Sequence, residues 1–361
     1  MELSNQNILF LTRTMDLGGT ENVILQLCEI FKPRVNKIVV CSCGGINVEK
    51  IEQMGIEHYN IPDIAKKSPT SVLNVIKTVK KIIKEEQITV IHSHHRMAAM
   101  YAQILSKHGL IKIANAHNTF LDKRFLTKFA YRNTNIVAVG EMVKKNLTDD
   151  VGIDSSQISV IHNSVKQNKD IIEELPEIKE YRMKGKYIIG NIGRLSEQKG
   201  MEYYILSSQI VHNKYPNTCF FIIGDGEDKQ KLLDLVHEKK MDDYVIFLGY
   251  KDNIQNIMRQ LDFIVLSSLW EGLPLTPIEA FSVGKTVVAT AVDGTIEIVE
   301  DAVNGCLVEK KNYKQLAEKM IYLIENPEKK IDMEKNALNR YFEEFSYEKM
   351  SLKYIKYYEE L

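Results

Sequence analysis

Short apolar runs alternate with amphipathic stretches along the whole chain of 361 residues. Continuous β-branched runs of this kind are typical of strands that are buried on both faces. In the first half they predict strands at Asn7–Leu11, Lys37–Cys41, Thr89–His92, Lys112–Asn115, Asn135–Val139 and Ile158–Ile161. In the second half they predict strands at Tyr187–Asn191, Cys219–Ile223, Val245–Leu248, Phe263–Leu266, Thr286–Ala289 and Cys306–Val308. The alternation therefore predicts an α/β protein with two doubly wound parallel sheets.

A polar and strand-poor stretch separates the two halves. Residues 166–186 are rich in charge, which is typical of a linker. We therefore expect one Rossmann-like domain over residues 1–165 and a second over residues 187–340, with a helical pattern over residues 341–361. Ligands of open parallel sheets bind outside the carboxyl ends of the strands, so we expect the two domains to face a central cleft.

The composition is ordinary for a globular protein, with 44% hydrophobic and 26% charged residues. The five cysteines show no ligand spacing, which indicates small buried side chains in a reducing compartment. No apolar run approaches the roughly 18 residues of a membrane span, and the first residues lack the pattern of a signal peptide. We therefore expect a cytoplasmic protein.

The charge is distributed unevenly between the halves. Residues 1–165 contain 20 Lys and Arg against 15 Asp and Glu, and residues 166–361 contain 27 against 33. A basic half indicates either an anionic partner or simple attraction between the domains. The basic amphipathic patterns at Ser71–Glu86 and Asp122–Arg132 fit peripheral contact with an anionic membrane at its inner face, while an ordinary solvated surface is the alternative.

Two acidic residues, Glu271 and Glu279, flank a turn that follows the strand Phe263–Leu266. A helix is expected to begin at Thr276-Pro277, where free amides and the helix dipole favour an anion. The two carboxylates would suit the hydroxyl groups of a sugar attached to that anion. The segment Thr276–Glu279 also fits a capping box, so an alternative role of Glu279 is to stabilise the start of the helix.

Two cations follow the first strand of the second half, in Gly193-Arg194-Leu195 and Lys199-Gly200. Arginine offers a planar fork and lysine a compact charge, and together they can neutralise a diphosphate without a metal. The alternative is a pair of solvated loop cations. The turn Gly224-Asp225-Gly226 lacks the third glycine of a nucleotide fingerprint, which favours a structural role.

A paired glycine opens the first helix of the chain, in Gly18-Gly19-Thr20-Glu21 before the helix expected over Asn22–Ile30. Paired glycines let the backbone approach a ligand closely, and Thr20 is a candidate helix cap. An ordinary strand–helix turn is the alternative. The segment Leu248-Gly249-Tyr250 ends another strand, where backbone groups could pair with a nucleobase edge.

Histidines gather after two strands of the first half, as His92, His94 and His95 and as His117. Clustered histidines can hold a metal, but neither carboxylate nor cysteine spacing accompanies them and the chain contains no Asp-x-Asp. We therefore expect neither a metal nor another cofactor, and an ordinary loop histidine is the alternative for each residue.

The chain resembles the retaining glycosyltransferases of family GT4, which have the two-domain GT-B fold. The resemblance covers essentially the whole chain. Its most specific element is the spacing from Glu271 to Glu279, and Gly193-Arg194-Leu195, Lys199-Gly200, Gly18-Gly19-Thr20-Glu21 and Gly294-Thr295-Ile296-Glu297-Ile298 follow in the family's order. Relatives often carry Asn-Gly-Val-Asp where this chain has Asn163-Ser164-Val165-Lys166, and Gly-Gly where it has Gly294-Thr295.

The resemblance implies roles for individual residues. The residues implied in catalysis are Glu271, His117, Arg194 and Lys199. Arg194 and Lys199 would hold the donor diphosphate, Glu271 the donor sugar and Glu279 the ribose hydroxyls. The remaining donor contacts would come from Gly18, Gly19, Tyr250, Gly272, Leu273, Leu275 and Thr276. A C-terminal helix over residues 341–361 would cross back to the first domain.

The expected function is a metal-independent retaining transfer of a hexose or N-acetylhexosamine from a nucleotide sugar, with UDP as the expected nucleotide. The acceptor would be a saccharide or a lipid-linked saccharide, as in the assembly of surface polysaccharides, and no nucleic acid is expected as a partner. Two other classes stay open, a non-hydrolysing sugar-nucleotide 2-epimerase and a non-catalytic nucleotide-binding protein.

Overall fold

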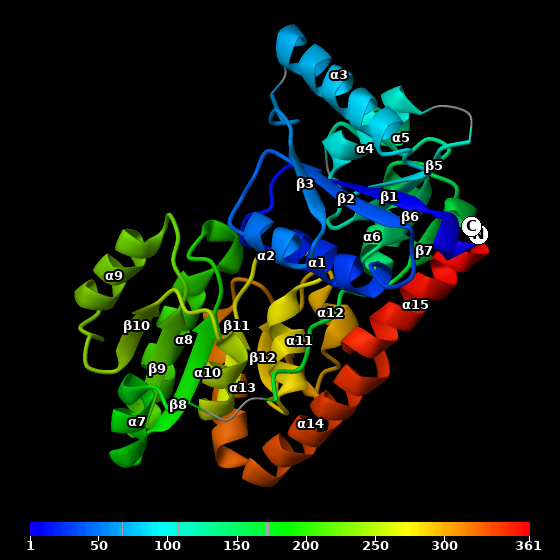
Figure 1. The fold of residues 1–361 in the computed structure, drawn as a ribbon. Helices are drawn as coiled ribbons and strands as arrows, with labels where there is room; N and C mark the ends of the chain where they lie inside the picture. The colour runs from blue at the N-terminus through cyan, green and yellow to red at the C-terminus, as the bar shows by residue number, and fades with distance from the viewer. Residues whose placement is uncertain (67, 107–108, 121, 170–172) are drawn as a thin grey trace. The chain divides into compact units, whose positions relative to one another are not determined.

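The computed structural model describes residues 1–66, 68–106, 109–120, 122–169 and 173–361. The chain forms two compact units (Figure 1). The first unit contains Met1–Asn163 together with Glu348–Leu361, and the second contains Ser164–Tyr347. Residues 170–172, which belong to the segment expected as a linker, lie outside the described residues.

The first unit is built on a seven-stranded sheet with the order β3-β2-β1-β4-β5-β6-β7. Its strands are β1 Asn7–Leu11, β2 Lys37–Ser42, β3 Glu57–Asn60, β4 Val90–Ser93, β5 Ile111–Ala116, β6 Asn135–Ala138 and β7 Ile158–Val160. All neighbouring strands in this sheet pair in parallel. The parallel, doubly wound sheet that was expected for the first half is therefore confirmed.

Helices cover both faces of this sheet (Figure 1). Their bounds are α1 Gly19–Phe31, α2 Val48–Gln53, α3 Pro69–Glu85, α4 Arg96–Leu105, α5 Arg124–Ala130 and α6 Glu141–Lys145. Apolar residues of α3 and α4, such as Val79 and Tyr101, pack with Leu9 and Ile91 of the sheet in one buried cluster. The sheet therefore forms the middle layer of this unit, and its strand ends are free to carry the site.

The second unit contains a six-stranded parallel sheet with the order β10-β9-β8-β11-β12-β13. Its strands are β8 Tyr187–Ile192, β9 Thr218–Ile223, β10 Val245–Gly249, β11 Phe263–Leu266, β12 Val287–Thr290 and β13 Gly305–Val308. Its helices are α7 Pro176–Met183, α8 Met201–Lys214, α9 Lys229–Glu238, α10 Ile254–Gln260, α11 Leu275–Ser282, α12 Thr295–Ile298, α13 Tyr313–Glu325 and α14 Pro327–Arg340. This strand order is that of a doubly wound nucleotide-binding sheet.

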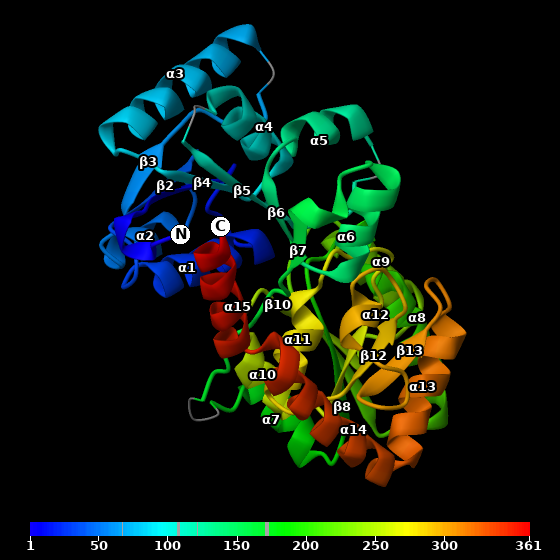
Figure 2. The ribbon, with the colours of Figure 1, turned by 90° about the vertical axis from the view of Figure 1, so that its right-hand side faces the viewer.

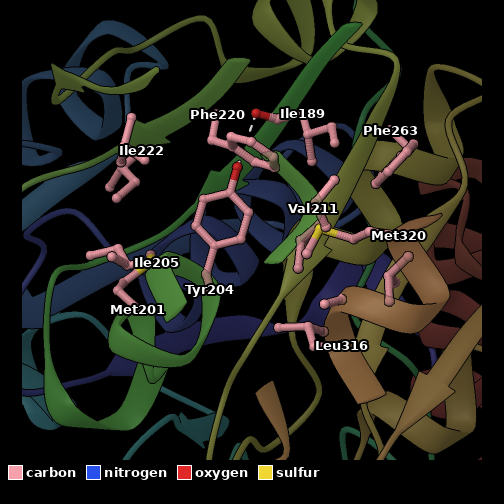
Figure 3. Close-up of a cluster of buried hydrophobic side chains, with 14 of the residues drawn as sticks. Ile189, Met201, Tyr204, Ile205, Val211, Phe220, Ile222, Phe263, Leu316 and Met320 are labelled. Atoms are coloured by element: carbon pink, nitrogen blue, oxygen red, sulfur yellow. Dashed lines mark hydrogen bonds between the residues drawn. The ribbon is translucent and has the colours of Figure 1, made fainter. Parts of the chain in front are cut away.

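The core of the second unit lies between its sheet and helices α8 and α13 (Figure 3). Tyr204 of α8 is fully buried, and its hydroxyl donates to the backbone oxygen of Ile189 in β8 at 3.0 Å. A tyrosine buried this deeply needs such a partner, because an unpaired hydroxyl in an apolar core costs free energy. The contact fixes α8 against the strand whose carboxyl end carries the loop of Arg194 and Lys199.

The C-terminal helix α15, Tyr347–Glu360, follows α14 and a π-helical turn at Tyr341–Phe345. From Glu348 onward its residues belong to the first unit, where they lie near the N-terminus (Figure 2). Tyr354 and Tyr358 are buried there, and their hydroxyls bond to Asn115 and His92 respectively. The last helix is thereby part of the core of the first unit.

Two elements differ from the sequence expectation. Strand β3, with the sequence Glu57-His58-Tyr59-Asn60, was missed because it lies at the edge of the sheet and its residues are exposed or half-buried. An edge strand of this kind carries no continuous apolar run. Helix α7 forms within the stretch that was expected to be a linker, where Ile178 is buried and Arg182 pairs with Asp262 at 3.0 Å.

Candidate active site

The loops that follow four strands of the second unit are packed backbone against backbone. A Cβ atom added to Gly224 would lie 1.9 Å from the carbonyl oxygen of Gly193, and one added to Gly294 would lie 1.9 Å from that of Gly272. Only glycine can occupy positions where two backbones approach so closely. The loop after β9 is therefore held to the loop after β8, and the loop after β12 to the loop after β11. Gly224 has the structural role that was expected for its turn.

A lysine–glutamate pair lies at the centre of these loops. Lys199 Nζ is 2.5 Å from Glu271 Oε1, and the Ser268 hydroxyl donates to the same oxygen at 2.7 Å. The Glu271 side chain is 8% exposed and that of Lys199 21%. Water screens such a pair poorly, so it is stronger than a surface ion pair, and removing one partner leaves an uncompensated charge. The structure thus brings together two predicted site residues that are 72 positions apart.

Lys199 is fixed by the turn that contains it. The short turn Glu197–Lys199 ends at Gly200, whose φ of 55° is in the left-handed region. The Ser267 hydroxyl donates to the backbone oxygen of Lys199 at 3.0 Å, and the Leu269 amide donates to that of Gln198 at 2.8 Å. The loop after β8 is therefore bonded directly to the loop after β11, which positions the ammonium group beside Glu271.

Arg194 is in a different environment from Lys199. Its Nε lies 3.1 Å from Glu227 Oε2, and the two side chains are 72% and 56% exposed. Such an exposed pair contributes little to stability and is easily exchanged for another anion. Arg194 is therefore free to turn toward a ligand, whereas Lys199 is already held in place.

The start of helix α11 corrects the expected capping box. The helix begins at Leu275 with Pro274 as its N-cap, and no side chain caps it. Thr276 is thus the second helical residue and not the N-cap. Glu279 is the fifth helical residue, whereas a capping box needs its acid at the third. Pro274 fixes the extended backbone that precedes a helix, and Pro277 is tolerated because amides of the first turn have no partner inside a helix anyway. The uncapped first turn leaves amides available to an anion.

Glu279 is half-buried on this helix. Burial raises the pKa of Glu279 to about 7, and the nearby charge of Lys199 opposes that rise. A carboxyl group with this pKa exchanges its proton around neutral pH. Perturbed acids of this kind are concentrated at functional sites, which supports a ligand contact for Glu279.

Three further residues complete the arrangement and were missed from the sequence. Asp293 Oδ2 accepts from the Glu271 amide at 3.0 Å, and its own φ of 34° is positive. Ser268 bonds to the Glu271 carboxylate, and Gln198 donates to the backbone oxygen of Trp270 at 3.0 Å. Ser268 and Gln198 gave no signal of their own, although Asp293 directly precedes the Gly294 segment.

Tyr250 follows strand β10 at the edge of the sheet and is 53% exposed. Burial raises the pKa of Tyr250, and a hydrogen bond with Asp252 raises it further. The carbonyl oxygen of Gly249 accepts from the Gly224 amide at 2.9 Å. That oxygen therefore already has a partner, so a nucleobase contact in this region would rely on the Tyr250 ring or on other backbone groups.

In the first unit, helix α1 begins at Gly19 with Gly18 as its N-cap and without a side-chain cap. Thr20 is already helical, so its expected role as the cap is wrong. The carboxyl of Glu21 lies over Gly18, where an added Cβ would be 2.4 Å from Glu21 Oε2. The Thr14 hydroxyl donates to Glu21 Oε1 at 3.2 Å, and burial raises the pKa of Glu21. The Glu21 carboxyl therefore covers the N-terminus of α1, where Gly18 and Gly19 have no side chains.

The histidines of the first unit form a stack at the ends of β4 and β5. The rings of His92 and His94 are 4.5 Å apart, and those of His94 and His117 are 5.4 Å apart. His94 Nδ1 lies 3.2 Å from His117 Nε2, while His94 Nε2 is buried and has no partner among the described residues. Burial lowers the pKa of His117 to about 4 and that of His92 to about 3. The stack is therefore neutral at physiological pH.

His92 has a structural role that the sequence did not reveal. Its Nε2 lies 2.8 Å from Asn115 Oδ1, an acceptor, so Nε2 must donate and Nδ1 must accept from the Tyr358 hydroxyl at 2.6 Å. Asn115 donates in turn to the Tyr354 hydroxyl at 2.7 Å. Within the described residues, no group of three or more His, Cys, Asp or Glu side chains is arranged to hold a metal ion.

Comparison with known families accounts for most of the chain. Residues 17–169 match the model described as Glycosyltransferase Family 4, and residues 173–340 match the model described as Glycosyl transferases group 1. The two matches adjoin each other in the order that the sequence motifs predict.

Individual relatives agree with this assignment. The chain is 29% identical over 327 residues to an uncharacterised glycosyltransferase of Methanocaldococcus jannaschii, covering 87% of each. It is 23% identical over 355 residues to the Escherichia coli UDP-Gal:alpha-D-GlcNAc-diphosphoundecaprenol alpha-1,3-galactosyltransferase, covering 90% of this chain and 89% of that one. The solved structure of Anabaena HepE in complex with UDP has the same fold, with a TM-score of 0.86, 20% identity and coverage of 99% and 100%.

Proposed function

The chain belongs to the family 4 glycosyltransferases and has the GT-B fold, and from this premise we propose that it transfers a hexose or N-acetylhexosamine from a UDP-linked donor. The transfer retains the anomeric configuration, requires no metal, and delivers the sugar to a saccharide or a lipid-linked saccharide. Assembly of a surface polysaccharide or another glycoconjugate is the process that fits this reaction.

The observation that carries the proposal is the Lys199–Glu271 pair beside the uncapped start of α11. A lysine and the amides of a helix start can receive a diphosphate, and the charge that develops on the departing phosphate gains most from groups that are already in position. Arg194 adds a second cation, because its exposed pair with Glu227 is easily exchanged.

The two glutamates divide the donor between them. Glu271 accepts hydrogen bonds from the sugar hydroxyls, with the backbone from Gly272 to Leu275 and with Thr276 alongside. Glu279 accepts from the ribose hydroxyls in its ionised form. The carboxylate of Glu271 is already bonded to Lys199 and Ser268, which makes it a poor nucleophile.

The departing phosphate is therefore the base in our proposal. The bond from the anomeric carbon to the phosphate oxygen breaks, and the bond to the acceptor oxygen forms on the same face of the sugar. The acceptor hydroxyl gives its proton to the phosphate, which leaves as UDP. The resemblance to the family also implies donor contacts for His117, Gly18 and Gly19.

Two of the similar proteins support UDP as the nucleotide. The Escherichia coli relative is named for UDP-Gal and for a diphosphoundecaprenol-linked acceptor, and the Anabaena structure was determined with UDP. The same relative supports a lipid-linked saccharide as one class of acceptor.

The proposal is tested by combining a binding screen with a transfer assay. UDP-glucose, UDP-galactose, UDP-N-acetylglucosamine and GDP-mannose are screened by thermal shift, since a ligand that binds the folded state raises its apparent stability. Transfer to lipid-linked and free saccharides is then measured with and without EDTA, and NMR assigns the anomeric configuration of the product.

Matched variants connect the assay to the site. We expect Lys199→Ala and Arg194→Ala to lower turnover by about two to three orders of magnitude while the fold survives. Lys214→Ala, which removes an exposed ion pair with Glu325, is the control. Near wild-type turnover in both site variants would refute the diphosphate assignment. Product formed without an acceptor would indicate an epimerase, and binding without turnover a non-catalytic protein.

A further inference from the structure

A pocket in the second unit lies at the opposite end of the sheet from the candidate active site. Its volume is about 480 Å³, which is within the range of pockets that hold small ligands. Helix α7 leads into β8, Asp262 directly precedes β11, and Lys285 comes shortly before β12, so the pocket lies at the amino ends of these strands. It is called the distal pocket below, and its charged lining residues are Glu174, Lys179, Arg182, Arg259, Asp262 and Lys285.

The walls of the distal pocket are helices α7 and α10. Both are short, and in the part of the chain that the structure describes no helix has the length and apolarity needed to cross a bilayer. Two hydrogen bonds hold these walls together. The Gln260 side chain accepts from the Leu175 amide at 2.9 Å and donates to the backbone oxygen of Glu173 at 2.9 Å. The pocket is therefore a built part of the second unit.

Lys285 is held at the end of helix α11, whose other end lies in the candidate active site. Gly284 has a φ of 71°, and its amide donates to the backbone oxygen of Phe281 at 3.0 Å. The Lys285 amide donates to that of Ala280 at 2.9 Å, which completes the usual helix end at a left-handed glycine. Lys285 Nζ donates to the Leu261 carbonyl oxygen at 2.6 Å. This bond uses one of the three donors of the ammonium group and fixes it beside the pocket.

Within the described residues, no ion pair compensates the charge of Lys285. Asp262 is paired with Arg182 at 3.0 Å. Glu334 is paired with Lys330 at 2.7 Å. Lys285 is half-buried, and burial lowers its pKa, although the charges of both acids act in the other direction. A half-buried ammonium group without a counter-ion costs free energy, and an anion in the pocket would offset that cost.

The other charges of the distal pocket also favour an anion. Its lining contains four Lys and Arg residues against two acids. Lys179 is paired with Glu174 at 2.6 Å, but the two side chains are 53% and 62% exposed, so this pair is easily exchanged for another. Arg259 adds a guanidinium group, whose planar fork suits phosphate oxygens.

Apolar side chains line another part of the pocket. Ile178 and Leu261 are buried, and Met183 is 78% exposed. A phosphate group offers the cations several acceptor oxygens and more than one negative charge. The apolar side chains suit an organic group to which such a phosphate is attached.

We propose that the distal pocket binds a small molecule that carries a phosphate group, with Lys285 as the central cation and Ile178, Leu261 and Met183 against its organic part. Strand β11 has four residues, so roughly 13 Å of sheet, at about 3.3 Å per residue, separates the pocket from the loop of Glu271. A ligand in the distal pocket is therefore additional to the donor of the proposed function.

The test is calorimetric titration of the full-length protein with phenyl phosphate, inorganic phosphate and phenol. It uses the wild type and the double variant Arg194→Ala, Lys199→Ala, which lacks the cations of the candidate active site. We expect the double variant to bind phenyl phosphate at one site, inorganic phosphate more weakly, and phenol not at all. Adding Lys285→Met should weaken the binding of phenyl phosphate by about 10- to 100-fold, the scale of losing a hydrogen bond to a charged group.

A second variant tests the pocket without changing the core. Met183→Glu places a carboxylate at a largely exposed position of the lining, and it should weaken the binding of phenyl phosphate by about fivefold, the scale of one like charge nearby in water. Met183→Gln, which lacks the charge, should have a smaller effect. Leu352→Glu adds the same charge at a position of the first unit that is 65% exposed, and it should leave the affinity unchanged.

Three outcomes would overturn the proposal. The first is that phenyl phosphate does not bind the double variant, or binds it no more tightly than phenol does. The second is an affinity that is equal with and without Lys285→Met, in variants that thermal unfolding shows to be folded. The third is an effect of Leu352→Glu as large as that of Met183→Glu. None of these titrations measures turnover, so failure here and failure of the proposed function are distinguishable.

Discussion

The polar side chains at the strand ends differ between the two units: they are uncharged in the first unit and charged in the second. In the first unit, the stack of His92, His94 and His117 is uncharged, and burial lowers the pKa values of its rings. In the second unit, Lys199 and Glu271 are charged and paired, and Glu279 beside them has its pKa raised to about 7. The two units therefore keep polar side chains at their strand ends in opposite ways, as neutral rings in the first and as paired charges in the second.

The same contrast predicts opposite responses to pH. A histidine whose pKa is lowered in the folded state takes up its proton more readily when unfolded, so its contribution to stability is lost as pH falls from about 6.5 toward 4. A glutamate whose pKa is raised holds its proton more tightly when folded. Its contribution is therefore present below about 4.5 and is lost as pH rises toward 7. The two units should be most stable at different pH values.

The largest expected effect comes from removing the charge of Glu271. Glu271→Gln keeps the shape of the side chain but leaves Lys199 without its counter-ion and weakens the contacts proposed for the donor sugar. We expect turnover to fall by about 10³-fold, the scale of losing one preorganised electrostatic group. Steady-state kinetics measures it, with the donor that the thermal-shift screen selects. Glu325→Gln, which removes an exposed partner of Lys214, is the control, and a loss in Glu271→Gln no larger than in this control would show that the charged pair has no catalytic role.

Glu279→Gln should separate stability from donor binding. A permanently neutral side chain avoids the cost of ionising a buried carboxyl, so the second unit should be more stable than the wild type at pH 8, by up to roughly 3 kcal/mol, and about equal to it at pH 4. Donor affinity should decrease at pH 8, because the neutral amide is the weaker acceptor for the ribose hydroxyls. Hydrogen exchange read peptide by peptide measures the stability of each unit, and calorimetric titration measures the affinity. A variant that is less stable than the wild type at pH 8 would show that the ionised carboxylate stabilises the folded second unit, and it would refute this prediction.

The strands and several residues of the candidate site could be predicted from the sequence. All twelve expected strands are present, because a strand buried on both faces leaves a continuous apolar run. Lys199 and Glu271 could be nominated because they follow such strands. Their direct contact could not, since it depends on how closely Gly200 lets the loop after β8 approach the loop after β11: a Cβ atom added to Gly200 would lie 2.3 Å from the carbonyl oxygen of Ser267.

Other features depend on long-range contacts that leave no local pattern. The capping-box pattern at Thr276–Glu279 was misleading because the N-cap of the helix is Pro274, two residues before Thr276. His92 looked like a candidate ligand, yet its partners Tyr358 and Asn115 are 266 and 23 positions away. The pKa of Glu279 likewise arises from burial by the folded unit, which the charge pattern of the chain does not encode.

Tyr358→Phe should lower the free energy of unfolding of the first unit, with a smaller effect than those expected for Glu271→Gln and Glu279→Gln. The change removes the hydroxyl that donates to His92 Nδ1 and leaves that buried nitrogen without a partner, which costs about 1–3 kcal/mol. The neighbouring Tyr357→Phe is a close control, since the Tyr357 hydroxyl is buried and has no partner among the described residues. We expect faster hydrogen exchange in α15 and β4 for Tyr358→Phe only. Equal exchange in the two variants would refute the role of His92 as the link between this strand and the helix.

The smallest expected effect concerns His95, which caps α4 by accepting from the Met97 amide at 3.1 Å. Burial lowers the pKa of His117 most, and the positive charge of His95 lowers it further. His95→Asn keeps a side chain that can cap a helix but removes that charge. The pKa of His117 should therefore rise only slightly and stay far below 6.5, because burial still dominates. Titration of isotope-labelled histidines by NMR measures it. If His117 titrated near 6.5 in either protein, the stack would be charged at mildly acidic pH, and the contrast between a neutral first unit and a charged second unit would fail.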